Sequence, residues 1–105
     1  MGRIIGCHPP DNGGIQMAVA RAAAAGGNSM QLFTAIPKFY GDKSTISADR
    51  VRRFREAVEE HGLDARNFIV HGAYVLNVCT PKAEQWARAS AGLAKEMERS
   101  SVLGV

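Results

Sequence analysis

Residues 68–71 read Phe-Ile-Val-His, a short apolar run that ends directly in a histidine. A similar run occupies residues 3–7 and precedes His8, and another occupies residues 30–33. Apolar runs of this length, bounded by polar and turn residues, are typical of strands that are buried on both faces of a parallel sheet. The sequence therefore predicts three short parallel strands. The residues that directly follow them are His8, Thr34 and His71.

The first two strands are each followed by a segment with helical spacing. Apolar residues recur at helical intervals over residues 15–22, and the glycines at 26 and 27 are expected to end that helix. In the second unit Ser47 is the expected N-cap and Gly62 the expected end. The side chains that we expect this helix to bury are Val51, Phe54 and Val58.

The third strand is followed by a loop and then by a third helical segment. Thr80 is the expected N-cap, Pro81 the first helical residue and Gly104 the end of the helix. The side chains predicted to face inward are Trp86, Leu93 and Met97. Because the chain ends one residue after the expected cap, we expect residues 1–105 to form a single incomplete domain, cut before a fourth strand.

Three repeats of strand, loop and helix predict an α/β fold with a parallel sheet and right-handed crossovers. The pattern fits both a doubly wound sheet and a barrel. Of these, three consecutive βα units that form a partial TIM barrel are the fold that we expect.

Composition bounds the function only loosely. The chain has 46% hydrophobic and 22% charged residues, which is ordinary for a globular protein, and its net charge of +3 permits an anionic partner without identifying one. Four arginines between residues 50 and 55 are interpreted as the solvated flank of a helix. Cys7 and Cys79 lack paired spacing, so a reduced, cytoplasmic protein is expected. Apolar runs are too short for a membrane span or a signal peptide.

Three polar residues are candidates for a shared functional rim. The carboxyl ends of parallel strands lie at one edge of a sheet, so His8, Thr34 and His71 are expected to converge there. Imidazole is the commonest metal-binding side chain, but a catalytic zinc site needs about three protein ligands. Each histidine has an alternative interpretation. His71 could be only a polar cap at a strand end, and His8 could be only a polar residue placed by the turn at Pro9.

Two loops carry residues suited to nucleic acid. Lys38, Phe39 and Tyr40 combine a cation with two aromatic rings, which suits a phosphate and a stacked base. Tyr74 and Val75 offer a similar surface after the third strand. The alternative is that these rings simply cover the top of the barrel.

The order and spacing of these motifs resemble the opening motifs of endonuclease IV-type apurinic/apyrimidinic endonucleases, within the xylose isomerase-like TIM barrel superfamily. The resemblance lies in residues 5–14, residues 32–38 and, most specifically, residues 71–78. It runs along the whole chain and covers about the N-terminal third of a typical member.

The resemblance implies a zinc-dependent DNA-repair enzyme that cleaves the phosphodiester 5′ to an abasic site in double-stranded DNA. His71 would be a zinc ligand, Lys38 would take the place of a DNA-inserting arginine, and Tyr74 and Val75 would lie on the loop that probes the minor groove. Ile36 stands where an asparagine is usual. Lysine keeps the charge of arginine but loses its planar fork.

Because the remaining zinc ligands of such enzymes belong to later strands, we expect this chain to be inactive by itself. Two alternatives remain open. The chain is a fragment of a xylose isomerase-like sugar isomerase or epimerase, or it is a non-catalytic barrel fragment that forms homo-oligomers through exposed sheet edges.

Overall fold

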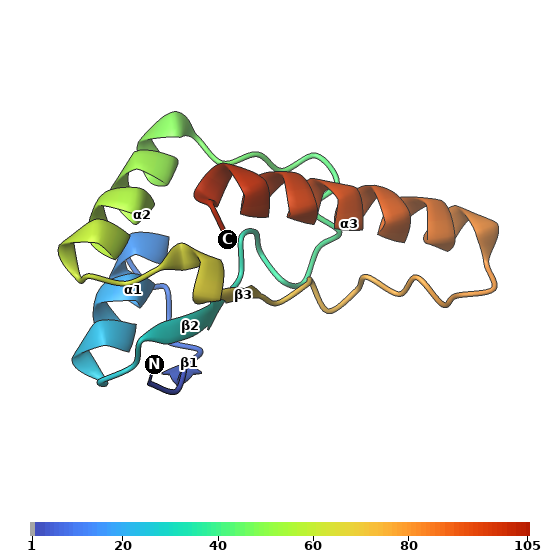
Figure 1. Cartoon of the computed structure of the whole chain (residues 1–105). Coiled ribbons are helices and arrows are strands. Elements are labelled where there is room, and N and C mark those ends of the chain that lie inside the picture. Colours follow the sequence, from blue (N-terminus) through green and yellow to red (C-terminus); the bar gives the residue numbers. More distant parts are fainter. Residues whose placement is uncertain (1) are drawn as a thin grey trace.

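The computed structural model describes residues 2–105 and confirms the α/β class (Figure 1). Strands and helices alternate along the chain, and each strand is short. Within the described residues, no helix is both long enough and apolar enough to cross a membrane. The elements are β1 (Gly6–Cys7), α1 (Ile15–Ala24), β2 (Ser29–Leu32), α2 (Ala48–Glu60), a 3₁₀ turn (Ala65–Asn67), β3 (Ile69–Val70) and α3 (Ala83–Leu103).

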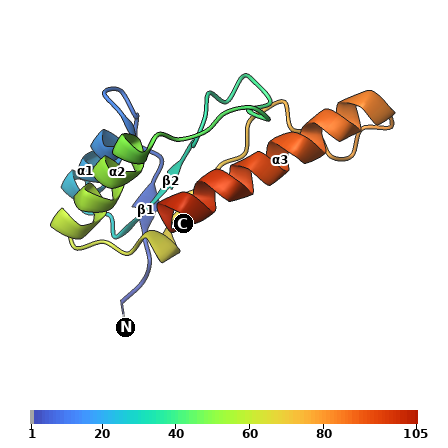
Figure 2. The same cartoon turned by 90° about the horizontal axis from the view of Figure 1, so that it is seen from above.

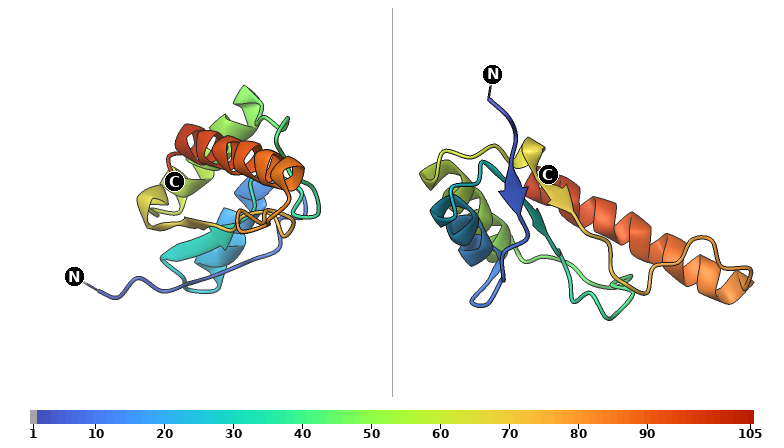
Figure 3. Two further views of the ribbon diagram at one scale, coloured as in Figure 1. Left: turned by 90° about the vertical axis from the view of Figure 1, so that its right-hand side faces the viewer. Right: turned by 90° about the horizontal axis from the view of Figure 1, so that it is seen from below.

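The strands form an open parallel sheet in the order β1-β2-β3. Gly6 pairs with Ser29 in the first ladder, and Leu32 pairs with Val70 in the second. All three helices lie on the same face of the sheet, and the opposite face carries none (Figure 3). A doubly wound sheet carries helices on both faces, whereas a barrel carries them only outside. The arrangement is therefore consistent with a partial TIM barrel.

The hydrophobic core lies between the sheet and the α1–α2 pair. Ile15 and Val19 of α1 pack with Met30 and Leu32 of β2, and Phe54 of α2 is fully buried between them. The rings of Phe54 and Phe68 meet edge to face, with their centroids 6.1 Å apart. Burial of such side chains supplies most of the stabilisation of a small domain.

The ends of α1 and α2 follow the sequence predictions. Gly26 has a φ of +83°, and the amide of Gly27 donates to the carbonyl of Ala22, which ends α1. At the start of α2 the Ser47 hydroxyl accepts from the amide of Arg50 at 3.2 Å. Gly62 has a φ of +64° after the last turn. These caps are confirmed, as is the burial of Phe54 and Val58.

Two predictions about α3 are wrong. The helix begins at Ala83 rather than at Pro81, and the Thr80 hydroxyl accepts from the amide of Lys82 ahead of the first turn. Trp86, Leu93 and Met97 do not face inward but are exposed on the outer surface. The buried face is turned by about a quarter of the helix circumference and carries Ala89, Gly92, Glu96, Arg99 and Leu103.

The reason for this difference is the direction of α3. The helix diverges from the α1–α2 pair, and its N-terminal half lies beside the two long loops rather than over the apolar layer (Figure 2). The backbone carbonyls of these loops need hydrogen-bond donors. Arg99 and its partner Glu96 therefore lie on the inward face of α3, and the apolar stripe lies on the outward face.

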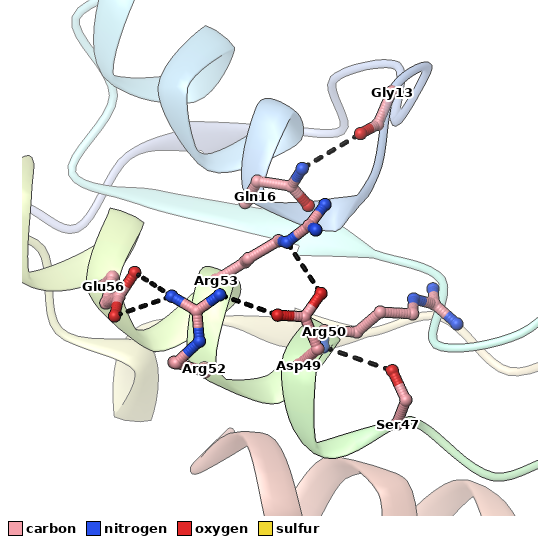
Figure 4. Close-up of polar contacts among 8 residues, drawn as sticks. All are labelled: Gly13, Gln16, Ser47, Asp49, Arg50, Arg52, Arg53 and Glu56. Carbon is pink, nitrogen blue, oxygen red and sulfur yellow. Dashed lines mark hydrogen bonds and ion pairs between the residues drawn. The ribbon is translucent and has the colours of Figure 1, made fainter.

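Two of the four arginines of α2, Arg52 and Arg53, form exposed ion pairs within the helix (Figure 4). Arg52 contacts Asp49 at 2.7 Å and Glu56 at 2.9 Å, and Arg53 contacts Asp49 at 2.8 Å. The hydrogen bond from Arg52 lowers the pKa of the Asp49 carboxyl. Exposed pairs of this kind contribute little stability. All four arginines are exposed, in agreement with the sequence interpretation, and Arg55 donates to the carbonyl of Val102 in α3.

Candidate active-site rim

The carboxyl ends of β1 and β3 bring two histidines together. His8 follows β1, and His71 follows β3 and continues its ladder, since its amide donates to the carbonyl of Leu32 at 2.9 Å. The centroids of the two imidazole rings lie 6.1 Å apart. Residues 63 positions apart in the sequence thus share one edge of the sheet.

Hydrogen bonds fix the orientation of both imidazoles. Nδ1 of His71 donates to the carbonyl of Gly72 at 2.6 Å, and Nδ1 of His8 donates to the side-chain oxygen of Gln31 at 2.9 Å. A neutral imidazole that donates from Nδ1 carries its lone pair on Nε2. A backbone or amide oxygen on Nδ1 is also the usual outer partner of a metal-binding histidine. Both rings therefore suit a role as Nε2 ligands or proton acceptors.

An aromatic cluster surrounds the two histidines. The ring of Phe33 lies between them, 4.8 Å from His8 and 4.9 Å from His71, and Tyr74 meets both Phe33 and His71 edge to face. These rings line an open cavity of about 500 Å³, to which Asp11 also contributes. The rim thus offers two imidazoles and one carboxylate on an aromatic floor.

Thr34 follows β2 but does not join the histidines. Its side chain is buried on the side of the strand that faces α3, where its hydroxyl contacts Glu96 and accepts a hydrogen bond from Arg99. Of the three strand-end residues, His8 and His71 line one cavity, whereas the Thr34 hydroxyl lies in a buried contact with α3.

The loops after β2 and β3 are joined above the rim. The amide of Tyr74 donates to the carbonyl of Pro37 at 2.8 Å, which ties one loop to the other. Lys38 and Tyr74 are exposed, whereas Val75 is half-buried. The ring of Tyr40 is also half-buried and lies under the guanidinium of Arg88 at 4.1 Å. Lys38 and Tyr74 are therefore accessible to a ligand, and Tyr40 is engaged within the protein.

The rim does not hold enough ligands for a metal ion by itself. Within residues 2–105, no group of three or more histidine, cysteine, aspartate or glutamate side chains is placed to bind one ion. Two nitrogen donors suit zinc in kind, but a catalytic zinc site needs about three protein ligands. The donor set of this chain is thus incomplete for zinc.

Several residues of this region were not predicted from the sequence. Glu96 and Arg99 were not singled out from the sequence, because charged residues at a spacing of three are common on exposed helix faces. Gly92 lies against the carbonyl of Tyr40, where a Cβ atom would come within 2.6 Å of the oxygen. Its occurrence on the same helix face as Ala89 was the available signal, since small residues mark a close approach.

Comparison with known proteins places these features in a family. The family described as xylose isomerase-like TIM barrel matches residues 19–105. The match covers the second part of α1 together with β2, α2, β3, α3 and both long loops.

Individual relatives agree with this match. A protein of Phocaeicola vulgatus named "Probable endonuclease 4" is 33% identical over 101 residues, which cover 96% of this chain and 36% of that protein. Proteins of the same name from Halobacterium salinarum and Haloarcula marismortui are 33% and 29% identical over similar coverage. The chain spans about a third of the length of the curated relatives it matches.

Proposed function

Because the chain belongs to the xylose isomerase-like TIM barrel family, we propose that it forms one side of the active site of an endonuclease IV-type DNA-repair enzyme. Such an enzyme hydrolyses the phosphodiester 5′ to an abasic site. We propose further that residues 1–105 correspond to its first three βα units, a single incomplete domain. The observation that carries the proposal is the meeting of His8 and His71 at one aromatic cavity, beneath the loops that bear Lys38 and Tyr74.

His71 is the proposed zinc ligand of this chain, through Nε2. Its Nδ1 is bound to the carbonyl of Gly72, and in the neutral ring this hydrogen bond leaves the lone pair on Nε2. His8 has the same tautomer and lies on the same cavity, so it would assist as a second ligand or as a proton acceptor. Zinc in such a site supplies Lewis-acid activation of the phosphodiester and of water. Its other ligands would come from beyond these residues, and this chain alone is expected to be inactive.

Lys38, Tyr74 and Val75 are the proposed DNA contacts. The exposed ammonium of Lys38 suits a phosphate, and the exposed ring of Tyr74 suits stacking on a base beside the gap left by a missing one. Val75 is half-buried and would support its neighbour Tyr74. Side chains inserted in this way stabilise a kinked duplex with an extruded nucleotide.

The direct test is binding to a damaged duplex. Fluorescence anisotropy would compare a labelled duplex that carries a tetrahydrofuran abasic analogue with the same duplex undamaged. We expect tighter binding to the damaged duplex, and a loss on the order of tenfold for Tyr74→Ala, which is typical of a lost stacking contact. Trp86→Ala is the control, because Trp86 is also an exposed aromatic ring and is not among the residues that line the cavity.

Lysine variants add a second arm. Lys38→Ala should weaken binding and reduce its salt dependence, whereas Lys43→Ala, an exposed lysine of the same loop, should change it little. Equal affinity for the two duplexes, or equal effects of the two lysines, would contradict the proposal. Saturable binding of D-xylose in place of DNA would favour the sugar isomerase alternative.

Self-association is a second candidate with an observation in its favour. Ile4 and Ile5, just before β1, and Ile69 of β3 are exposed by 60%, 63% and 61%, and one face of the sheet carries no helix (Figure 3). Apolar surface of this kind is usually covered by a partner. Light scattering coupled to size exclusion is the test: a dimer or larger species supports association of the chain with copies of itself, and a monomer contradicts it.

A further inference from the structure

Three polar side chains form a buried cluster between the sheet and α3. Thr34, Glu96 and Arg99 are exposed by only 2%, 6% and 3%. Nε of Arg99 donates to the Thr34 hydroxyl at 2.8 Å, the Thr34 hydroxyl donates to the Glu96 carboxylate, and Nη2 of Arg99 donates to the same carboxylate at 3.1 Å. Burial of an ion pair is unfavourable unless its hydrogen bonds are satisfied, so the third guanidinium nitrogen of Arg99, Nη1, also needs an acceptor.

That donor binds the loop that carries Lys38. Nη1 of Arg99 donates to the carbonyls of Gly41 at 2.8 Å and Ser44 at 3.0 Å. Gly41 has a φ of +68°, and a Cβ atom there would lie 3.1 Å from Nη2 of Arg99. One guanidinium thus holds the backbone of residues 41–44 against α3 with two hydrogen bonds.

Two further residues of α3 press on the same loop. Gly92 lets the helix approach the carbonyl of Tyr40 and the side chain of Leu76, and Arg88 covers the Tyr40 ring. Leu76 belongs to the second loop, which is also joined to the first through the amide of Tyr74 and the carbonyl of Pro37. One face of α3 therefore contacts both loops that bear the proposed DNA contacts.

We propose that Glu96 and Arg99 are positioning residues, which hold the loop of residues 33–47 and, through Pro37, Tyr74 in the arrangement that binds the abasic duplex. The proposal rests on the proposed function for its DNA arm. Stability alone is a poor explanation of this cluster, since apolar residues of similar size often replace buried ion pairs in other proteins without loss of stability. Apolar residues do not, however, bind loop carbonyls.

Arg99→Lys tests the proposal without changing the net charge. Lysine keeps the cation beside Glu96, but it lacks the planar fork that reaches Thr34, Gly41 and Ser44 together. Amide hydrogen exchange would be followed at Phe39, Ser44 and Tyr74, which donate within and between the loops, and at Leu63, which donates to Val58 at the end of α2. We expect roughly tenfold faster exchange at the three loop amides and no change at Leu63, as for local opening.

Binding to the abasic duplex is measured on the same variant. We expect a several-fold loss of affinity for the damaged duplex in Arg99→Lys. Glu96→Gln should show the same pattern, whereas Glu98→Gln, its exposed neighbour on the same helix, should show neither effect. Gly92→Ala gives a variant that leaves every charge in place and disturbs the Tyr40 carbonyl, and it should also speed exchange in the loop.

The outcomes separate the two proposals. Unchanged loop exchange in Arg99→Lys and Gly92→Ala, or equal acceleration at Leu63, overturns the positioning role. Faster loop exchange with unchanged binding to the abasic duplex overturns it as well. If the unmodified protein shows no preference for the abasic duplex, the proposed function fails, and the exchange data alone then decide whether Arg99 orders the loop.

Discussion

The α1–α2 layer and α3 pack on the same sheet by different means. Between α1, α2 and β2 the contacts are almost wholly apolar, with Phe54 and Val19 completely buried. Along α3 the inward face holds an ion pair and a glycine, while Trp86 and Met97 are exposed. Apolar contacts tolerate changes among side chains of similar volume, whereas a buried ion pair needs specific hydrogen-bonding partners. The first region holds the fold together, and the second fixes the loops above the candidate site.

The largest expected effect is the loss of an apolar core side chain. Phe54→Ala should lower the free energy of unfolding by about 4 kcal/mol, because it removes a buried ring and leaves a cavity between α1, β2 and Phe68. Urea denaturation followed by circular dichroism measures it. Leu93→Ala, a half-exposed leucine of α3, should change the value by no more than about 0.5 kcal/mol. Similar losses for both variants would remove the contrast between the regions.

The next effect concerns the buried ion pair. Arg99→Met should destabilise the chain by about 3 kcal/mol, since it leaves the Glu96 carboxylate buried without its partner. The double variant Glu96→Leu with Arg99→Met should recover most of that loss, because it removes the unpaired charge along with the pair. A double variant as unstable as the single one would show that the cluster stabilises the fold as well as the loop.

The smallest effect lies on the solvated face of α2. Arg52→Gln should raise the pKa of Asp49 toward its ordinary value, because the hydrogen bond from Arg52 is the main cause of its depression. A carboxyl with a lowered pKa adds stability at pH values above its unfolded pKa and loses it as the pH falls through its folded pKa. The free energy of unfolding of the variant should therefore fall slightly less as the pH is lowered into the acid range.

Carboxyl carbon chemical shifts followed in an acid titration measure this change. Asp64, which Arg66 holds in the same way on the 3₁₀ turn, is the internal control and should titrate unchanged. A shift at Asp64 equal to that at Asp49 would mean that the substitution acts on the whole chain rather than on the pair.

The sequence predicted the parts of the fold that rest on local chemistry. Ser47, Gly62 and Gly104 were placed correctly because caps and left-handed positions depend on residue type within one turn. The apolar spacing also identified Phe54 and Val58. The choice between a barrel and a doubly wound sheet needed the strand order and the side on which the helices lie, which no local pattern contains.

The failures concern α3 and the partners of its charges. Apolar periodicity pointed to Trp86, Leu93 and Met97, but an apolar stripe does not reveal which surface of the protein it meets. The burial of Glu96 and Arg99 was not predicted, because it depends on contacts with Thr34 and Gly41, more than fifty residues earlier. For the candidate site, the strand ends located His8 and His71. The side on which Thr34 lies was not predictable without the sheet register.

The proposed site depends most on His71 presenting Nε2 to the cavity that it shares with His8. Long-range ¹H–¹⁵N spectra of the histidine rings, recorded during a zinc titration, test this directly. We expect an Nδ1-protonated His71 whose Nε2 resonance moves on addition of zinc, together with that of His8, while exposed His61 at the end of α2 stays unchanged. An Nε2-protonated His71, or a zinc response at His61 as large as that at His71, would contradict it.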